Sequence, residues 1–131
     1  METAERTFVD TDILIDVFRR VPRAVDFWRR TEARTQFACS VFSVFELMTG
    51  CRNLREQRQV FRYLSTLDIV HVERSDSVNA LRWYRSFFLS LGIGFVDCLI
   101  AAAAVREHCV LYTLNTKHFR AVPSLHVKRP Y

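Results

Sequence analysis

Apolar residues recur along the chain with two spacings, one typical of amphipathic helices and one typical of short buried strands. The helical spacing predicts helices at residues 13–20, 22–33, 41–49, 54–64, 75–91 and 95–108. Short β-prone runs predict strands at residues 7–9, 37–39, 69–72, 110–113 and 125–127. Because strands and helices alternate, we expect an α/β fold with a central parallel sheet that helices cover on both faces.

Polar residues and glycines mark the ends of these helices. Asp12 is the expected N-cap of the first helix and Ser40 that of the third, and Pro22 suits the first turn of the second. Gly50 ends the third helix, and Gly92 ends the long helix that begins near residue 75. In parallel sheets the chemistry collects at the carboxyl ends of the strands, so the residues that follow each strand are the first candidates for a site.

The composition fits one globular domain spanning residues 1–131. Of the 131 residues 50% are hydrophobic and 25% are charged, with three Gly and three Pro, which excludes a disordered chain. The apolar runs are too short to span a membrane, and the four cysteines lack zinc-site spacing. We therefore expect a cytoplasmic protein with free thiols.

The net charge is +5, from 19 basic and 14 acidic residues. Almost all of the basic residues are arginines, which suits phosphate recognition but is also typical of an arginine-rich genome. The charge therefore permits a nucleic-acid partner without requiring one.

Three acids occupy positions where a carboxylate is costly or lacks an obvious structural role. Asp10 directly follows the first strand, and Asp12 is better placed to cap the next helix. Glu46 interrupts an otherwise apolar helix, in which Ser43 is its polar neighbour. A helix this apolar is expected to be buried on most sides, and a contact between Glu46 and an arginine at the rim is the alternative to a role as ligand or catalytic acid. Asp97 lies in the first turn of an apolar helix, where the helix dipole is an alternative explanation. Converging carboxylates suit Mg²⁺, and with a basic exterior they indicate phosphodiester hydrolysis by a metal-activated water.

A polar segment after the fourth strand is expected at the same edge of the sheet. Thr113 is a candidate donor to an acid, and Asn115 is a candidate neutral ligand or water-positioning group. Lys117 and His118 are candidates for phosphate contact. A plain polar turn is the alternative for each of them.

Four motifs taken together resemble the PIN-domain family, in particular its VapC-type toxins from bacterial toxin–antitoxin pairs. They are residues 9–15 with Asp10, residues 43–47 with Glu46, residues 97–102 with Asp97, and residues 113–119 with Asn115. Each motif is weak alone, but their order and spacing over nearly the whole chain make the resemblance specific.

The resemblance implies a three-layer α/β/α domain and a metal-dependent ribonuclease in which Asp10, Glu46 and Asp97 bind Mg²⁺ or Mn²⁺. It also implies a homodimer and a cognate antitoxin that blocks the site. Two departures from the family pattern are present: Asp12 takes a position that is commonly Asn or Ser, and Asn115 and His118 stand where a further acid is usual. The number of bound cations therefore stays open.

Two surfaces are candidates for partners. Apolar residues cover more of the 75–91 helix than packing against one core requires. The additional apolar residues around Trp83 and Phe87 indicate a dimer or antitoxin surface, and burial of this helix inside the domain is the alternative. In and before the 54–64 helix, basic residues at helical spacing predict an RNA-binding stripe or a solvated face. They are Arg52, Arg55, Arg58 and Arg62.

Two other functions are compatible with parts of this pattern. One is a non-catalytic RNA-binding module on the same fold, although three retained costly acids argue against it. The other is a haloacid-dehalogenase-type phosphatase, because Asp10-Thr11-Asp12 after a strand imitates its nucleophile motif. That class also requires a motif lysine and a later acidic pair, which Lys117, Lys128 and Asp97 do not supply.

Overall fold

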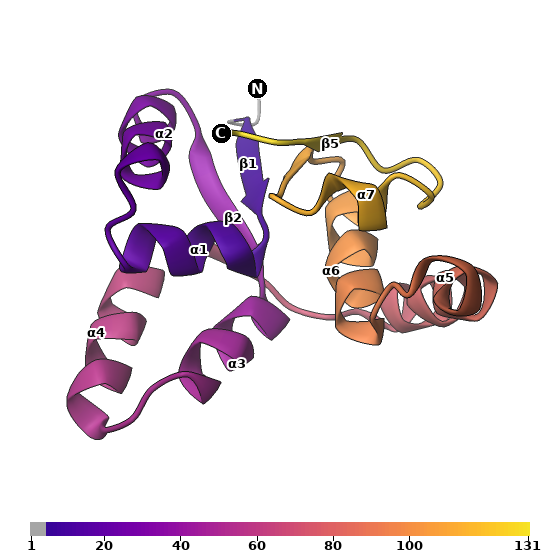
Figure 1. The fold of residues 1–131 in the computed structure, drawn as a ribbon, viewed down its shortest axis with the longest axis horizontal. Coiled ribbons are helices and arrows are strands. Elements are labelled where there is room, and N and C mark those ends of the chain that lie inside the picture. Colours follow the sequence, from indigo (N-terminus) through magenta and orange to yellow (C-terminus); the bar gives the residue numbers. More distant parts are fainter. Residues whose placement is uncertain (1–4) are drawn as a thin grey trace.

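The computed structural model describes residues 5–131 and contains one five-stranded parallel sheet in the order β3-β2-β1-β4-β5 (Figure 1). The strands are β1 (Arg6–Val9), β2 (Gln36–Ser40), β3 (Asp68–Val70), β4 (Leu111–Tyr112) and β5 (Val127–Lys128). The helices are α1 (Thr11–Phe18), α2 (Pro22–Glu32), α3 (Val41–Thr49), α4 (Leu54–Leu64), α5 (Arg74–Leu91), α6 (Phe95–Arg106) and α7 (Thr116–Phe119). The predicted α/β fold with a central parallel sheet flanked by helices is confirmed.

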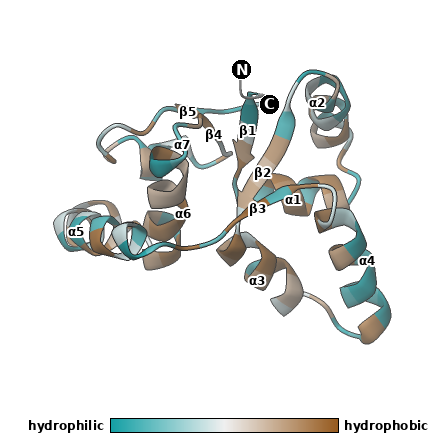
Figure 2. Cartoon of the chain, turned by 180° about the vertical axis from the view of Figure 1, so that it is seen from behind, coloured by the Kyte–Doolittle hydropathy of each residue, from teal (hydrophilic) through white to brown (hydrophobic). Residues whose placement is uncertain are grey.

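Consecutive strand residues point to opposite faces of the sheet and build a separate core on each. Phe8 belongs to the core formed with α5 and α6, whereas Val9 belongs to the core formed with α1, α2 and α4. Accordingly, α1–α4 lie on one side of β1 and α5–α7 on the other (Figure 1). In Figure 2, α6 is mainly hydrophobic, whereas α4 carries hydrophilic residues on its outer side.

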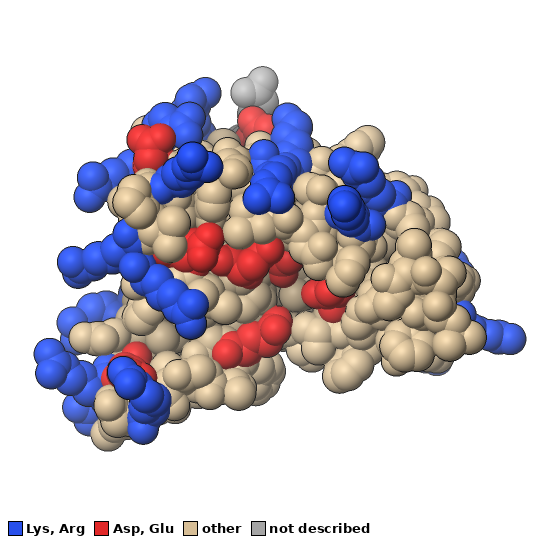
Figure 3. All heavy atoms as spheres, in the orientation of Figure 1, with Lys and Arg blue, Asp and Glu red and all other residues tan. Residues whose placement is uncertain are grey.

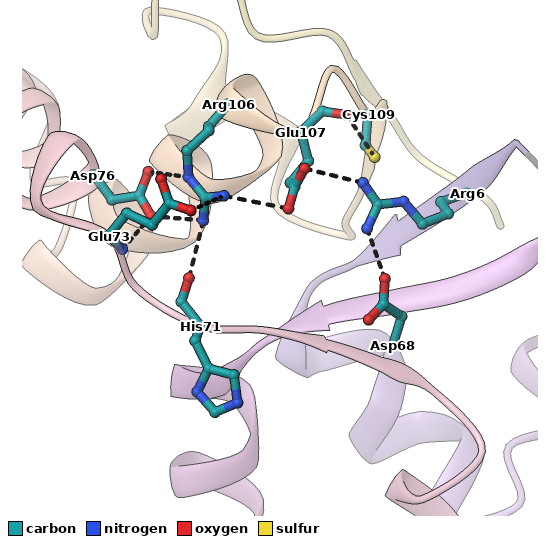
Figure 4. A network of polar contacts seen from close by, with 8 residues as sticks. All are labelled: Arg6, Asp68, His71, Glu73, Asp76, Arg106, Glu107 and Cys109. Carbon is teal, nitrogen blue, oxygen red and sulfur yellow. Dashed lines mark hydrogen bonds and ion pairs between the residues drawn. The ribbon is translucent and has the colours of Figure 1, made fainter. Parts of the chain in front are cut away.

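Ion pairs join strands and helices near the amino ends of the strands (Figure 4). Arg6 contacts Asp68 and Glu107 at 2.6 and 3.1 Å. Arg106 donates through Nε and Nη2 to the two oxygens of Asp76, each at 2.9 Å, and Asp76 is only 1% exposed. Because a buried carboxylate is costly without a partner, this pair fixes α6 against α5 and thereby helps to position Asp97 at the other end of α6.

The ends of several elements differ from the prediction. The first helix begins at Thr11, and its N-cap is Asp10, whose side chain accepts from the Thr11 N–H. The expectation that Asp12 is the cap is therefore wrong, and so is the premise that Asp10 has no structural role. A short helix, α7, forms in the polar segment after β4, where the sequence predicts no helix. Gly92, with φ of 69°, ends α5 as predicted, in a conformation that favours glycine.

The four cysteines are free, as expected. Within residues 5–131, no helix is both long enough and apolar enough to cross a bilayer.

Candidate active site at the carboxyl edge of the sheet

The strand order brings polar residues from distant parts of the chain to one edge of the sheet. Asp10 follows β1, Ser40 ends β2, and Thr113 follows β4, the neighbour of β1 on its other side. Ser40 caps α3 by accepting from the Phe42 N–H at 3.1 Å, and α3 carries Glu46. The first turn of α6 adds Asp97.

Asp10 is the most enclosed acid of this group, with 6% of its surface exposed. Its Oδ1 accepts from the Thr11 N–H and its Oδ2 accepts from the Thr113 hydroxyl, both at 2.8 Å. Burial, followed by the charge of Asp12, raises the pKa of Asp10 to about 7, and Asp97 adds to the same effect. The two hydrogen bonds favour the ionised form but do not offset the loss of solvent.

Asp12 lies beside Asp10 and takes part in the same hydrogen-bond network. Its Oδ1 accepts from the Ile13 N–H at 2.8 Å, and its Oδ2 accepts from the Leu114 N–H at 3.0 Å and lies 3.3 Å from the Thr113 hydroxyl. Burial raises the pKa of Asp12, and these hydrogen bonds partly oppose the rise. Asp12 therefore links α1 to the segment after β4.

Glu46 lies at the mouth of the site, and the residue is exposed. The expectation that the apolar helix buries it is wrong, because α3 buries one side only, through Ser43, Val44 and Leu47. Glu46 is nevertheless held in place, since the Thr11 hydroxyl donates to its Oε1 at 2.8 Å. The Ser43 hydroxyl lies 2.8 Å from the same Thr11 oxygen.

Asp97 faces Glu46 and His118 at the rim. Burial raises the pKa of Asp97, the charge of Glu46 raises it further, and His118 opposes the rise. The Nδ1 of His118 lies 3.9 Å from Asp97 Oδ2 and 2.8 Å from the side-chain nitrogen of Asn115. The Asn115 amide is therefore engaged with His118, and its backbone N–H donates to the Thr113 hydroxyl at 3.0 Å.

Thr11 was not singled out from the sequence, yet it contacts two of the three candidate acids, because its N–H donates to Asp10 and its hydroxyl donates to Glu46. Its only sequence signal is a hydroxyl between two acids at the start of a helix. Thr113, by contrast, contacts an acid as its position after the fourth strand suggested.

The donor set fits a divalent cation that prefers oxygen ligands, although the side chains do not enclose one. Within residues 5–131, no group of three His, Cys, Asp or Glu side chains lies close enough to hold a metal ion. In the same range, the one basic side chain at ion-pair distance from Asp10, Asp12, Glu46 or Asp97 is His118. Carboxylate oxygens with uncompensated negative charge are the environment that Mg²⁺ or Mn²⁺ relieves, provided that the side chains rotate toward the ion.

Figure 3 shows acidic side chains across the middle of one face, with basic side chains mainly above them and to their left. Of the predicted stripe, Arg55, Arg58 and Arg62 are exposed on α4. Arg52 contacts Glu56 at 2.8 Å, which neutralises much of its charge. Lys117 is exposed on α7.

The apolar surface of α5 does not lie where the sequence placed it. Trp83 is 7% exposed and belongs to the core, and Phe87 packs against the same core. The exposed apolar side chains of α5 are instead Val78, Leu81, Phe88, Leu89 and Leu91. The partner surface predicted around Trp83 and Phe87 is therefore wrong, because α6 covers this side of α5.

Comparisons with known proteins agree with this architecture. Residues 7–125 match the family described as PIN domain. The chain is 35% identical over 114 residues to Ribonuclease VapC10 of Mycobacterium tuberculosis, and the aligned residues cover 85% of this chain and 84% of VapC10. It is 27% identical to a chain of a toxin–antitoxin complex from Klebsiella pneumoniae, with a TM-score of 0.78. The superposition covers 95% of this chain and 98% of that one. VapBC-1 of nontypeable Haemophilus influenzae shares the fold, with a TM-score of 0.80 at 19% identity and coverage of 95% and 98%. This chain belongs to the PIN-domain family.

Proposed function

We propose that the chain is a divalent-cation-dependent ribonuclease and the toxin of a toxin–antitoxin pair acting in the cytoplasm. The acidic site carries this proposal. At the carboxyl edge of the sheet, burial and the charges of Asp12 and Asp97 raise the pKa of Asp10, and burial and the charge of Glu46 raise the pKa of Asp97. The raised pKa of Asp10, about 7, means that its ionised form is poorly stabilised by the protein alone. The similarity to Ribonuclease VapC10 supports RNA as the substrate.

In this proposal Asp10, Glu46 and Asp97 hold Mg²⁺ or Mn²⁺ through carboxylate oxygens, and Asn115 positions a water at the rim. Such a cation, when bound, would supply Lewis acidity to the phosphoryl group and to a water nucleophile. The hydroxyl of Thr113 orients Asp10 and that of Thr11 orients Glu46.

Cleavage of a labelled single-stranded RNA tests the proposal directly. The wild-type chain should cleave the RNA in Mg²⁺ or Mn²⁺, and cleavage should stop when EDTA removes the cation. The cleavage rates of Asp10→Asn and Glu46→Gln should each fall at least 100-fold, about the size expected for loss of a catalytic group. Asp26→Asn, at an exposed acid on α2, is the matched control and should keep the wild-type rate. Cleavage that survives EDTA or both site variants would contradict the proposal, and RNA binding without any cleavage would favour the non-catalytic module.

A groove on this chain, beside the acidic site, is the binding surface we propose for the antitoxin. The groove has a volume of about 520 Å³ and lies between α1, α3 and α4. Ile15, Phe18, Leu47 and Val60 give it apolar walls, and Glu46 lies at its edge. A partner segment seated there would cover Glu46. The similarity to a chain of a toxin–antitoxin complex supports a protein partner.

We also propose that two copies of the chain pair through α5. The exposed apolar side chains of this helix lie between Val78 and Leu91, about 20 Å at the usual helical rise, and Leu89 is 93% exposed. Exposed apolar side chains gathered on one helix suit pairing with the same helix of a second copy.

A further inference from the structure

Residues Arg129–Tyr131, here called the strap, follow β5 and lie beside the acidic site. The Thr113 N–H donates to the Lys128 carbonyl at 3.0 Å, so the strap begins next to the segment that holds Asp10 and Asp12. At its other end, the Tyr131 hydroxyl donates to Asp16 Oδ2 at 2.9 Å, one helical turn beyond Asp12. The Tyr131 ring also packs near Phe27, with ring centroids 6.3 Å apart. The strap is therefore anchored at both ends.

The guanidinium of Arg129 is attached to the backbone that supports the site. Its Nη1 donates to the Leu114 carbonyl oxygen at 3.2 Å, and the N–H of Leu114 donates to Asp12 Oδ2 at 3.0 Å. A single residue thus connects the Arg129 guanidinium to a carboxylate of the site.

Most of the hydrogen-bonding capacity of Arg129 is unused. The residue is exposed, and among residues 5–131 no carboxylate lies within ion-pair distance of it. Arg6, Arg52 and Arg106 are paired with acids, whereas Arg129, like exposed Arg55 and Arg58, is in no ion pair within the described part of the chain. A guanidinium has five N–H donors, so the contact with Leu114 leaves the remaining ones available to a ligand.

We propose that Arg129 forms a phosphate subsite at the rim of the acidic site and binds an RNA phosphate adjacent to the one that is cleaved. This inference rests on the proposed ribonuclease function. A cluster of carboxylates repels a polyanion, and a guanidinium held beside it attracts the neighbouring phosphate through paired hydrogen bonds. The contact with Leu114 and the anchored strap orient the side chain before RNA arrives, which reduces the entropy lost on binding.

Binding of a fluorescent single-stranded RNA to the Asp10→Asn chain isolates this effect from cleavage. Arg129→Ala in that background should weaken binding about tenfold, the usual size for one charge-assisted contact. It should also reduce the slope of log affinity against log salt by about 0.7, the value for one phosphate of a single strand. Arg129→Lys should keep the salt slope and lose part of the affinity. The matched control is Arg34→Ala, at an exposed arginine just before β2, and it should change binding less than twofold.

The active chain provides a second readout. Arg129→Ala should raise KM about tenfold and leave kcat within about twofold, because the subsite binds substrate without touching the reacting atoms. Tyr131→Phe, which keeps Arg129 but removes the hydroxyl that contacts Asp16, should raise KM by a smaller factor.

Three results would overturn the inference, and they differ in what they say of the proposed function. If the wild-type chain cleaves RNA and Arg129→Ala behaves like Arg34→Ala, the subsite is wrong and the ribonuclease proposal stands. If Arg129→Ala lowers kcat with KM unchanged, Arg129 acts by positioning Asp12 and binds no phosphate. If the wild-type chain neither binds nor cleaves RNA, both proposals fail.

Discussion

Replacing Asp10 by Asn should stabilise the metal-free protein above neutral pH and should do so less as the pH falls. The raised pKa of Asp10 means that the folded protein holds this proton more tightly than the unfolded chain does. The stability that the protonated form contributes is complete below the ordinary carboxyl pKa of 3.8 and is lost as the pH rises through about 7. The amide of Asn is neutral at every pH, so Asp10→Asn does not bury a negative charge above pH 7. Its Oδ1 can still accept from the Thr11 N–H.

The magnitude follows from the size of the pKa change. A carboxyl pKa moved from 3.8 to about 7 corresponds to about 4 kcal/mol over the whole titration, of which about 3 kcal/mol falls between pH 5 and pH 8. The free energy of unfolding of Asp10→Asn, relative to wild type, should therefore rise by up to about 3 kcal/mol across that interval.

Urea unfolding at several pH values, in EDTA, measures this difference. EDTA is needed because a cation bound to ionised Asp10 would favour the wild type and reverse the trend. Asp26→Asn, at an exposed acid, should give a difference that is flat with pH. A constant difference between Asp10→Asn and wild type from pH 5 to pH 8 would refute the reasoning, since burial of Asp10 would then carry no electrostatic cost.

Three further predictions concern the rest of the molecule. Arg106→Met should lower the free energy of unfolding by about 3–5 kcal/mol in urea titrations, because it leaves buried Asp76 without its partner, and Asp76→Asn in the same chain should restore part of the loss. Addition of Mg²⁺ should raise the Tm of the wild type more than that of Glu46→Gln, and equal shifts would mean that Glu46 is no ligand. Leu89→Arg should shift the sedimentation coefficient toward that of a monomer with little change in Tm, and an unchanged assembly would argue against pairing through α5.

The sequence predicted the layers of the fold well because their signals are local. A run such as Thr7-Phe8-Val9 and the apolar spacing of the 95–108 segment each depend on residues a few positions apart. Helix ends were less predictable. Asp10 and Asp12 are both acceptable caps by residue type, and the path of the backbone after β1 selects Asp10.

Exposure at the site could not be predicted from composition. The apolar segment around Glu46 suggested a buried carboxylate, but a helix that packs on one side leaves the other to solvent, and Glu46 lies on that side. The same limit applies to α5, where apolar residues cover most of the helix and the packing of α6 determines that Trp83 is buried and Leu89 is exposed.

The sequence by itself therefore determined the alternation of strands and helices and membership of a family, and it singled out Asp10, Glu46 and Asp97 as candidates for a site. The tertiary structure decided which polar groups meet. Thr113 reaches Asp10 across 103 positions of sequence, Thr11 reaches Glu46 across 35, and Arg129 reaches Leu114 across 15. Periodicity reports only on residues within a few turns of one another, whereas these contacts depend on the order and register of parallel strands, which bring distant segments to one edge of the sheet.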